Sequence, residues 1–519
     1  MAPFFYVCHI MQGLIFGGQL EDLGLEFDPT LTSIRRSSGG HKIATFLRRN
    51  GYDIDIIDYI HRWNLDQFKS YIRPRVTKDT LFFGFGSTFS LTTPPVMELI
   101  SWLKEEYPHI ARIAGSQNNS MTELDMDWYV YGWGENAMLV LLDHLQGGPE
   151  PIHTGRLING YVNYKSFPMD DLRVSYREED FIQPREILLL EFARGCKFKC
   201  KFCSFPVLGV KGDASRDAQS VYDEMLENYD KWGTEHYIVL DETFNDSSQK
   251  VEKFANVIEK LPFTPKMTAY IRADLITSRK QDWDNLIKMG ITSHFYGVES
   301  LNHKAAKSIG KGMDSGRIKE GLLEVDEYFR SAGHYKGHIS LIAGLPHETI
   351  DSLRDTGKWL SQYWNQNSYH MNVLMIKDLS KSNASLDHNS EFDKNWFDYG
   401  YRKDIIPIDD IDWSKSRNPY YKTLYDFVRS TGYYLCWRNQ DTTLHDVMRF
   451  CAEEFSGYQA KNLIDPFMYD KFFIDPEVQW SDFATKENMD RRTDHIVNHI
   501  DGYIQKKLNQ VPSVTIDKL

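Results

Sequence analysis

Short apolar runs alternate with segments of helical periodicity over roughly the first 150 residues of the chain. Apolar runs bounded by turn residues predict buried strands, and the helical segments between them predict a parallel sheet covered by helices. The predicted strands are Phe4–Ile10, Ile54–Ile57, Leu81–Phe85, Ile110–Ala114 and Trp128–Tyr131. We therefore expect residues 1–150 to form a Rossmann-like or flavodoxin-like α/β domain.

Two helices of this domain can be placed from their ends. A loop that contains Gly17 follows the first predicted strand, and a helix is expected at Gly40–Arg49, closed by Gly51. Pro95 is expected to begin a second helix, because proline is tolerated in the first turn. The residues expected to share one face of this second helix are Met97, Ile100 and Leu103.

The alternation of strands and helices resumes after a polar stretch at residues 151–185, which prolines mark as a linker. Further strands are predicted at Ile187–Phe192, Tyr237–Leu240, Thr268–Ile271, Phe295–Val298, Ile339–Ala343 and Met371–Met375. These units predict a partial (βα)6 barrel over residues 186–380. Parallel strands of a barrel direct their carboxyl ends to one mouth, so ligands are expected there.

Residues 381–519 change to polar loops and aromatic-rich helices. Helices are predicted at Tyr420–Trp437 and Thr442–Phe455. A last helix is expected to dock on the body through Ile496, Ile500, Tyr503 and Ile504. We expect this mainly helical region to cover the barrel mouth and to select the substrate.

Composition narrows the classes of function. Of the 519 residues, 41% are hydrophobic and 26% are charged, which is the composition of a globular protein. The start lacks a basic segment followed by a long apolar one, and no run of about 18 apolar residues occurs. We therefore expect a cytoplasmic protein with no membrane partner. The net charge of −13 disfavours a grip on nucleic acid and favours a small-molecule or peptide substrate.

Three of the six cysteines, Cys196, Cys200 and Cys203, follow a predicted strand with the spacing C-x3-C-x2-C. Such clustering does not suit a disulfide framework and fits a reducing cytosol. Three thiolates from one loop can hold a [4Fe–4S] cluster and leave one iron free for a substrate or cofactor. A structural zinc site needs four closed ligands, and no fourth cysteine or histidine is suitably placed nearby.

At these cysteines the chain resembles the radical S-adenosylmethionine superfamily over about residues 186–378. The resemblance implies that the three cysteines are catalytic ligands of a [4Fe–4S] cluster, whose open iron chelates S-adenosylmethionine. It also implies that an electron, supplied by a donor such as flavodoxin or ferredoxin, cleaves this cofactor to a 5′-deoxyadenosyl radical. The residues that the resemblance places near S-adenosylmethionine are Phe202, Asp241, Glu242, Arg272, Glu299, Ser300 and Gly344.

Residues 40–58 and the turn Gly132–Ala137 resemble the cobalamin-binding domain that precedes the radical domain in one large subclass. This extends the resemblance over about residues 1–378 and implies cobalamin as a further cofactor. Ligands of such open sheets lie outside the carboxyl ends of the strands. The residues expected to approach cobalamin are Gly86, Ser87, Gly115, Ser116, Gly132 and Glu135. The Asp-x-His-x-x-Gly signature that supplies a histidine below cobalt is missing, so bound cobalamin is expected to lack this ligand.

Three functions are compatible with these patterns. The leading hypothesis is cobalamin-dependent methylation of an unactivated carbon. The second is a rearrangement, cyclisation or epimerisation by a radical enzyme of the same architecture, and the third is a non-enzymatic protein with a structural metal cluster. Methylthio-transferases are excluded because only Cys8 lies upstream for a second cluster. Auxiliary clusters near the C-terminus are excluded because only Cys436 and Cys451 remain there.

Overall fold

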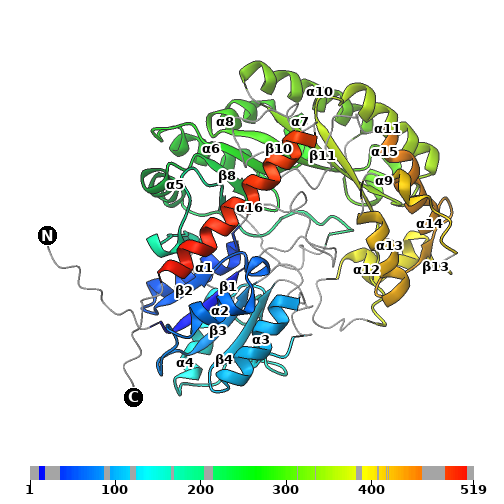
Figure 1. Ribbon diagram of the computed structural model, residues 1–519. Helices are drawn as coiled ribbons and strands as arrows, with labels where there is room; N and C mark the ends of the chain where they lie inside the picture. The colour runs from blue at the N-terminus through cyan, green and yellow to red at the C-terminus, as the bar shows by residue number, and fades with distance from the viewer. Residues whose placement is uncertain are drawn as a thin grey trace. The chain divides into compact units, whose positions relative to one another are not determined.

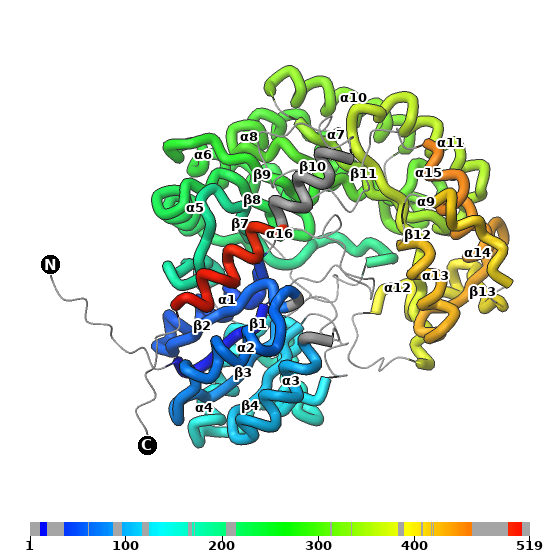
Figure 2. Tube along the Cα trace, viewed as in Figure 1, coloured from blue at the N-terminus to red at the C-terminus, as the bar shows by residue number. Residues whose placement is uncertain are grey.

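The chain folds into two compact units in the computed structural model. The described residues are 11–17, 36–86, 94–116, 124–164, 169–203, 214–311, 314–333, 335–381, 389–405, 408–416, 418, 420–458 and 486–510. One unit is Met1–Glu186 together with Asp490–Leu519, and the other is Ile187–Met489. Each contains one large parallel sheet (Figure 1 and Figure 2). Of the helices described, none has the length and the apolar run that crossing a bilayer requires.

The first unit contains a six-stranded parallel sheet in the order β2-β1-β3-β4-β5-β6. Its strands are β1 Gly13–Gly17, β2 Ile54–Ile57, β3 Phe82–Gly86, β4 Ala111–Ser116, β5 Trp128–Tyr131 and β6 Leu157–Asn159. The order of the first five is the flavodoxin-like one, which confirms the expected α/β class. β6 lies in the stretch expected to be a linker, so part of residues 151–185 extends the sheet beside β5.

β1 lies where the sequence pattern indicates a loop, and the strand predicted at Phe4–Ile10 falls outside the described residues. A Cβ atom at Gly13 would approach the ring of Phe82 to 2.2 Å, and one at Gly17 would lie 2.5 Å from the Cβ of Ser37. The glycines that suggested a loop therefore serve close packing of a buried strand.

Four helices accompany the strands of this unit. They are α1 Ser38–Arg49, α2 Leu65–Ile72, α3 Pro94–Glu106 and α4 Glu135–Leu145. α1 begins where the Ser37 hydroxyl accepts a hydrogen bond from the Gly40 N–H at 3.1 Å. The chain turns away after α1 at Gly51, whose φ is +88°. The helix predicted at Gly40–Arg49 is thus confirmed.

The buried face of α3 differs from the predicted one by a single residue. Ile100 and Leu103 are buried as expected, whereas Met97 is 38% exposed. Val96 and Leu99 occupy the buried face instead. The prediction for Met97 is wrong because the spacing of the apolar residues is compatible with two different buried faces of the helix.

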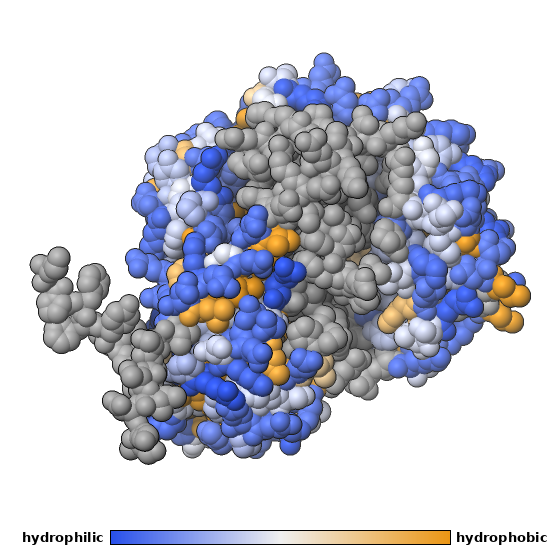
Figure 3. Space-filling model, viewed as in Figure 1, coloured by the Kyte–Doolittle hydropathy of each residue, from blue (hydrophilic) through white to orange (hydrophobic). Residues whose placement is uncertain are grey.

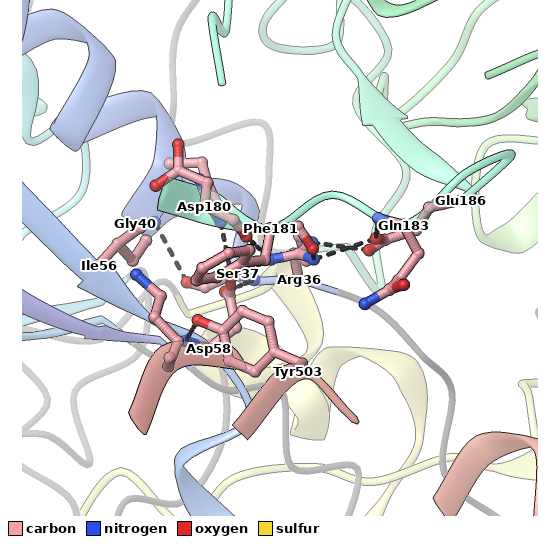
Figure 4. Close-up of polar contacts among 12 residues, drawn as sticks. Arg36, Ser37, Gly40, Ile56, Asp58, Asp180, Phe181, Gln183, Glu186 and Tyr503 are labelled. Carbon is pink, nitrogen blue, oxygen red and sulfur yellow. Dashed lines mark hydrogen bonds and ion pairs between the residues drawn. The ribbon is translucent and has the colours of Figure 1, made fainter. Parts of the chain in front are cut away.

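A buried guanidinium connects distant parts of the first unit. Arg36 donates hydrogen bonds to Asp58 at 2.8 Å and to Glu186 at 2.6 and 3.0 Å (Figure 4). It also donates to the carbonyl oxygens of Asp180 and Phe181, at 2.8 and 2.9 Å. Burial opposes the charge on Arg36, but Glu186 and Asp58 outweigh it and raise its pKa. Arg36 therefore connects the end of β2 to the segment that precedes the second unit in the sequence.

The last helix, α16 Lys486–Asn509, belongs to the first unit from Asp490 onward. The buried residues of its predicted docking face are Ile500, Tyr503 and Ile504, and the side chain of Ile496 lies outside the described residues. The Tyr503 hydroxyl accepts the backbone N–H of Asp58 at 2.9 Å, and its ring centroid lies 5.0 Å from the guanidinium of Arg36 (Figure 4). Lys507 donates to Asp55 at 2.9 Å. These contacts tie the C-terminal segment to the first sheet.

The second unit contains a parallel sheet in which consecutive strands are neighbours, in the order β12-β11-β10-β9-β8-β7. Its strands are β7 Leu188–Leu190, β8 His236–Val239, β9 Lys266–Ile271, β10 Ile291–Glu299, β11 Lys336–Ala343 and β12 Ser368–Val373. This order with two free edges, β7 and β12, is that of a partial barrel. The predicted (βα)6 arrangement is confirmed.

Helices on the outer side of this sheet connect its strands (Figure 1). They are α5 Ala218–Trp232, α6 Ser248–Ile258, α7 Ala273–Ser278, α8 Trp283–Lys288, α9 His303–Ser308, α10 Ser315–Ala332 and α11 Ile350–Tyr363. Figure 3 shows mainly hydrophilic residues on their visible outer surface, with hydrophobic residues in small groups. The apolar faces of the helices are therefore used against the sheet.

The rest of the second unit is mainly helical, as expected. Its elements are α12 Glu391–Asn395, β13 Arg402–Lys403, α13 Tyr420–Thr431, β14 Trp437–Arg438, α14 Leu444–Arg449, the π-helix Phe450–Phe455 and α15 Ser456–Tyr458. The helix predicted at Tyr420–Trp437 is shorter, because Gly432 with φ +60° ends it. The Trp437 indole donates to the carbonyl oxygen of Leu374 at 2.9 Å, just after β12.

We expect replacement of Arg36 by Leu to lower the free energy of unfolding by about 3–5 kcal/mol, because it leaves the carboxylates of Asp58 and Glu186 buried without their partner. Urea unfolding followed by circular dichroism measures this. Arg73→Leu is the matched control, since Arg73 pairs with Glu106 at the surface and its loss should cost much less than the loss of Arg36. Equal losses for the two variants would contradict the account of the buried network.

Candidate active site

The loop that carries the three cysteines starts shortly after β7, at the carboxyl end of the sheet. Gly195 has φ +84° and donates its backbone N–H to Glu242 at 3.1 Å, so a left-handed residue opens the loop. The Cys203 N–H donates to the carbonyl oxygen of Cys200 at 3.1 Å, which closes a tight turn. All three cysteines are free thiols and are partly exposed. Phe202 lies half-buried within this turn.

Arg272 supplies a positive charge to the cysteine loop. Its Nη1 lies 3.3 Å from the Sγ of Cys200, and its guanidinium lies 4.0 Å from the ring centroid of Phe198. Asn245 holds the Arg272 backbone by accepting its N–H at 2.8 Å and donating to its carbonyl oxygen at 3.1 Å. A fixed guanidinium at this distance stabilises negative charge on a thiolate or on an anionic cluster.

Asp241 and Glu242 follow β8 and serve different purposes. One carboxylate oxygen of Asp241 accepts the N–H groups of Phe192 and Ala193 at 2.8 and 3.0 Å, and the other accepts from Lys250 at 3.0 Å. One oxygen of Asp241 thus holds the start of the cysteine loop, and the other pairs with Lys250 of α6. Contact of Asp241 with a cofactor stays a prediction, and Glu242 is the better placed of the two.

Glu242 can change its charge near neutral pH. Burial raises the pKa of its carboxyl to about 7, with the nearby Asp241 and Glu191 adding to the effect. Its hydrogen bond from Gly195 places it beside the first cysteine of the motif. A carboxylate in this position can accept hydrogen bonds from the ammonium group of an amino acid.

Glu299 ends β10 in an unusual backbone conformation. Its φ is +67°, and only 7% of the residue is exposed. Burial raises the pKa of its carboxyl, and Lys311, whose Nζ lies 3.4 Å from Oε1, opposes this rise. Lys311 also donates to the carbonyl oxygen of Gly297 at 2.8 Å. The sequence predicted Glu299 at this strand end but gave no sign of Lys311.

Ser300 and Gly344, also predicted near the cofactor, meet at a third carboxylate. The Ser300 hydroxyl and the Gly344 N–H both donate to Glu348. Gly344 has φ +92°, and its carbonyl oxygen accepts the Tyr401 hydroxyl at 2.7 Å. The link between Glu348 and Ser300 joins residues far apart in the sequence and could not be seen from spacing.

Parallel pairing brings the cysteine loop and the ends of β8, β9, β10 and β11 to one edge of the sheet. Within the described parts of the chain, no three Cys, His, Asp or Glu side chains lie close enough together to hold a metal ion. The donor chemistry of three thiols beside a guanidinium fits an anionic iron–sulfur cluster.

Two glycines at the carboxyl edge of the first sheet have room for a small side chain among the described residues. A Cβ atom at Gly86 would lie 3.8 Å from the hydroxyl oxygen of Ser37, and one at Gly115 would lie 3.9 Å from the carbonyl oxygen of Val130. These are ordinary van der Waals distances and neither position has a left-handed φ, so neither close packing among the described residues nor conformation requires glycine there. Gly86 ends β3 and Gly115 lies near the end of β4, at the edge where ligands of such sheets bind.

The other predicted cobalamin contacts differ from these two. A Cβ atom at Gly132, whose φ is +88°, would lie 2.3 Å from the Tyr161 ring, so packing already requires this glycine. Glu135 is 3% exposed in the first turn of α4. Ser116 ends β4, and Ser87 lies outside the described residues. Their approach to cobalamin stays a prediction.

Comparison with known proteins identifies the domain that carries the cysteines. Residues 190–360 match the model of the Radical SAM superfamily. The hopanoid C-3 methylase of Methylococcus capsulatus is 23% identical over 340 residues, which are 61% of this chain and 59% of the methylase. The alignment thus spans less than two thirds of that relative.

Solved structures share the fold. The radical S-adenosylmethionine methyltransferase TsrM from Kitasatospora setae, with cobalamin and a [4Fe–4S] cluster bound, matches with a TM-score of 0.62 and 12% identity over 93% of this chain and 99% of TsrM. The cobalamin-dependent radical enzyme OxsB matches with a TM-score of 0.52 and 16% identity over 75% of this chain and 56% of OxsB. Residues 190–360 therefore form a domain of the Radical SAM superfamily, and the chain shares the overall fold of TsrM and OxsB.

Proposed function

We propose that this enzyme cleaves S-adenosylmethionine reductively at a [4Fe–4S] cluster held by Cys196, Cys200 and Cys203, and uses cobalamin to methylate an unactivated carbon. The observation that carries the proposal is the three-cysteine loop at the carboxyl edge of the barrel sheet, with Arg272 at 3.3 Å from Cys200. Three protein thiolates leave one iron open to S-adenosylmethionine. When bound, the cluster supplies the electron that generates the 5′-deoxyadenosyl radical.

The surrounding side chains suit the charges of S-adenosylmethionine. Glu242 and Glu299 come from neighbouring regions of the same sheet edge and offer carboxylates to its ammonium group. Arg272 offsets the negative charge of the thiolates, so that reduction adds an electron to a partly compensated site. Ser300 and Gly344 hold the adjacent strand ends in place through their hydrogen bonds to Glu348.

The first unit supports the cobalamin part of the proposal. In sheets with its flavodoxin-like strand order, ligands bind at the carboxyl edge, where Gly86 and Gly115 lie. TsrM and OxsB, which share the fold at low identity, are described with cobalamin bound. Cobalamin would supply the methyl group to the substrate carbon. The substrate is proposed to be a small molecule or peptide, and the electron donor a flavodoxin or ferredoxin.

A radical enzyme that performs a rearrangement, cyclisation or epimerisation without methyl transfer is the competing function. One observation favours it. The turn at Gly132, which resembles a cobalamin-domain motif, is fully explained by its contact with Tyr161. A domain of this fold could therefore keep its structure without a ligand.

We expect anaerobically purified protein to hold close to one [4Fe–4S] cluster. Cys196→Ala, Cys200→Ala and Cys203→Ala should each abolish it, because the motif supplies only three thiolate ligands and the cluster needs all of them. Iron and sulfide analysis with visible spectroscopy measures this. Cys436→Ala is the control and should keep its iron, since Cys436 lies outside the motif. Zinc without iron in the wild-type protein would contradict the proposal.

We expect apo-protein incubated with hydroxocobalamin to retain about one equivalent after desalting, and expect Gly115→Val to reduce retention at least tenfold by adding a branched side chain at the end of β4, where the ligand is proposed to bind. Gly457→Val is the matched control, because a Cβ atom there meets nothing within 4 Å and the residue belongs to the other unit.

Paramagnetic resonance of reduced cobalt should show no nitrogen coupling from a protein histidine. Such coupling would contradict the ligation, and no retention by wild type would favour the competing function.

A further inference from the structure

A single buried carboxyl group joins the ends of two neighbouring strands in the second unit. Glu348 lies between β11 and α11 and is 2% exposed. Its Oε2 accepts the backbone N–H groups of Gly344 and Leu345 at 3.0 and 3.1 Å. Its Oε1 accepts the hydroxyl of Ser300 at 2.5 Å. Because Ser300 follows β10 and Gly344 follows β11, the side chain of Glu348 fixes both strand ends.

This link also constrains Glu299, which directly precedes Ser300. A non-glycine residue with φ +67° keeps that conformation only where its surroundings impose it. The adjacent Ser300 hydroxyl is held on both sides, since it donates to Glu348 and accepts the N–H of Asn302 at 3.1 Å. This arrangement fixes the position from which the Glu299 carboxylate projects beside Lys311.

We propose that Glu348 is a positioning residue for S-adenosylmethionine: by holding Ser300 and Gly344, it keeps Glu299 and the turn after β11 in the geometry that binds the cofactor. This inference rests on the proposed function. Glu348 itself is enclosed by protein groups and acts only through the residues that it holds.

The link is strongest when Glu348 is ionised, because the two backbone N–H groups can only donate and the negative charge strengthens all three hydrogen bonds. A protonated carboxyl can keep the Ser300 contact only by donating to its hydroxyl, and the hydrogen bonds from the two N–H groups then lose their charge assistance. Burial raises the pKa of Glu348 to about 7, and the three donors limit this rise. The titratable groups that face it are Tyr401 and Cys451, whose own pKa values burial raises, so both stay uncharged at neutral pH.

Affinity for S-adenosylmethionine is therefore expected to weaken as the pH falls through about 7, where Glu348 gains a proton. Glu242 also has a pKa of about 7 and contributes to the same profile. The contribution of Glu348 is isolated by comparing the wild-type profile with that of a variant that cannot ionise at this position.

The test measures the dissociation constant of S-adenosylmethionine from pH 6 to 8.5, by equilibrium dialysis of cluster-containing wild type, Glu348→Gln and Glu454→Gln. At the upper pH, we expect Glu348→Gln to bind on the order of tenfold more weakly, since an amide carries no charge to strengthen the hydrogen bonds from the two N–H groups and presents a donor where the carboxylate accepts from Ser300. The dissociation constant of this variant should also change less with pH than that of wild type. Glu454→Gln removes an exposed carboxylate that pairs with Arg354, and its profile should match wild type.

Hydrogen exchange of the Gly344 and Leu345 amides gives a second measurement that needs no cofactor. These amides should exchange about tenfold faster in Glu348→Gln, whereas Ser300→Ala should leave them protected and still weaken binding. Profiles of wild type and Glu348→Gln that superimpose, with equal amide exchange, would overturn the inference alone. No binding by cluster-containing wild type at any pH would overturn the proposed function and this inference together.

Discussion

Parallel strand pairing is the constraint on which both candidate sites depend. In each large sheet every strand runs parallel to its neighbours, so all carboxyl ends lie along one edge. In the second unit that edge collects the cysteine loop, Glu242, Arg272 and Glu299, which are far apart in the sequence. The chemistry of the site therefore follows from where the strands end.

Buried carboxylates fix the loops that leave these strand ends. Asp241 accepts two backbone N–H groups at the start of the cysteine loop, and Glu348 accepts two in the turn after β11. In the first unit, Asp58 at the end of β2 accepts from Arg36 and from the Ser37 N–H. A carboxylate that accepts several donors in a low-dielectric interior holds its partners firmly, because leaving any of them unpaired is costly. Buried carboxylates that accept several hydrogen bonds thus occur at the carboxyl edge of both large sheets.

The sequence predicted both sheets because buried parallel strands produce short apolar runs. It also indicated the cysteine loop, Arg272 and Glu299, since their motifs lie at predicted strand ends. It could not predict β1 as a strand, because its glycines are required by contacts with Phe82 and Ser37. Partners such as Lys311 of Glu299, or Tyr503 of Arg36, depend on tertiary packing and leave no local pattern. Propensity and spacing describe the strands, whereas side-chain links across them require the folded chain.

The central claim is that one iron of the cluster lacks a protein ligand and binds S-adenosylmethionine directly. Electron–nuclear double resonance of the reduced cluster tests it most directly, with S-adenosylmethionine labelled with ¹⁷O in the carboxylate and ¹⁵N in the amino group. Three-cysteine ligation predicts hyperfine coupling of both labels to the cluster in the wild-type protein. An intact [4Fe–4S] signal without coupling to either label would contradict it.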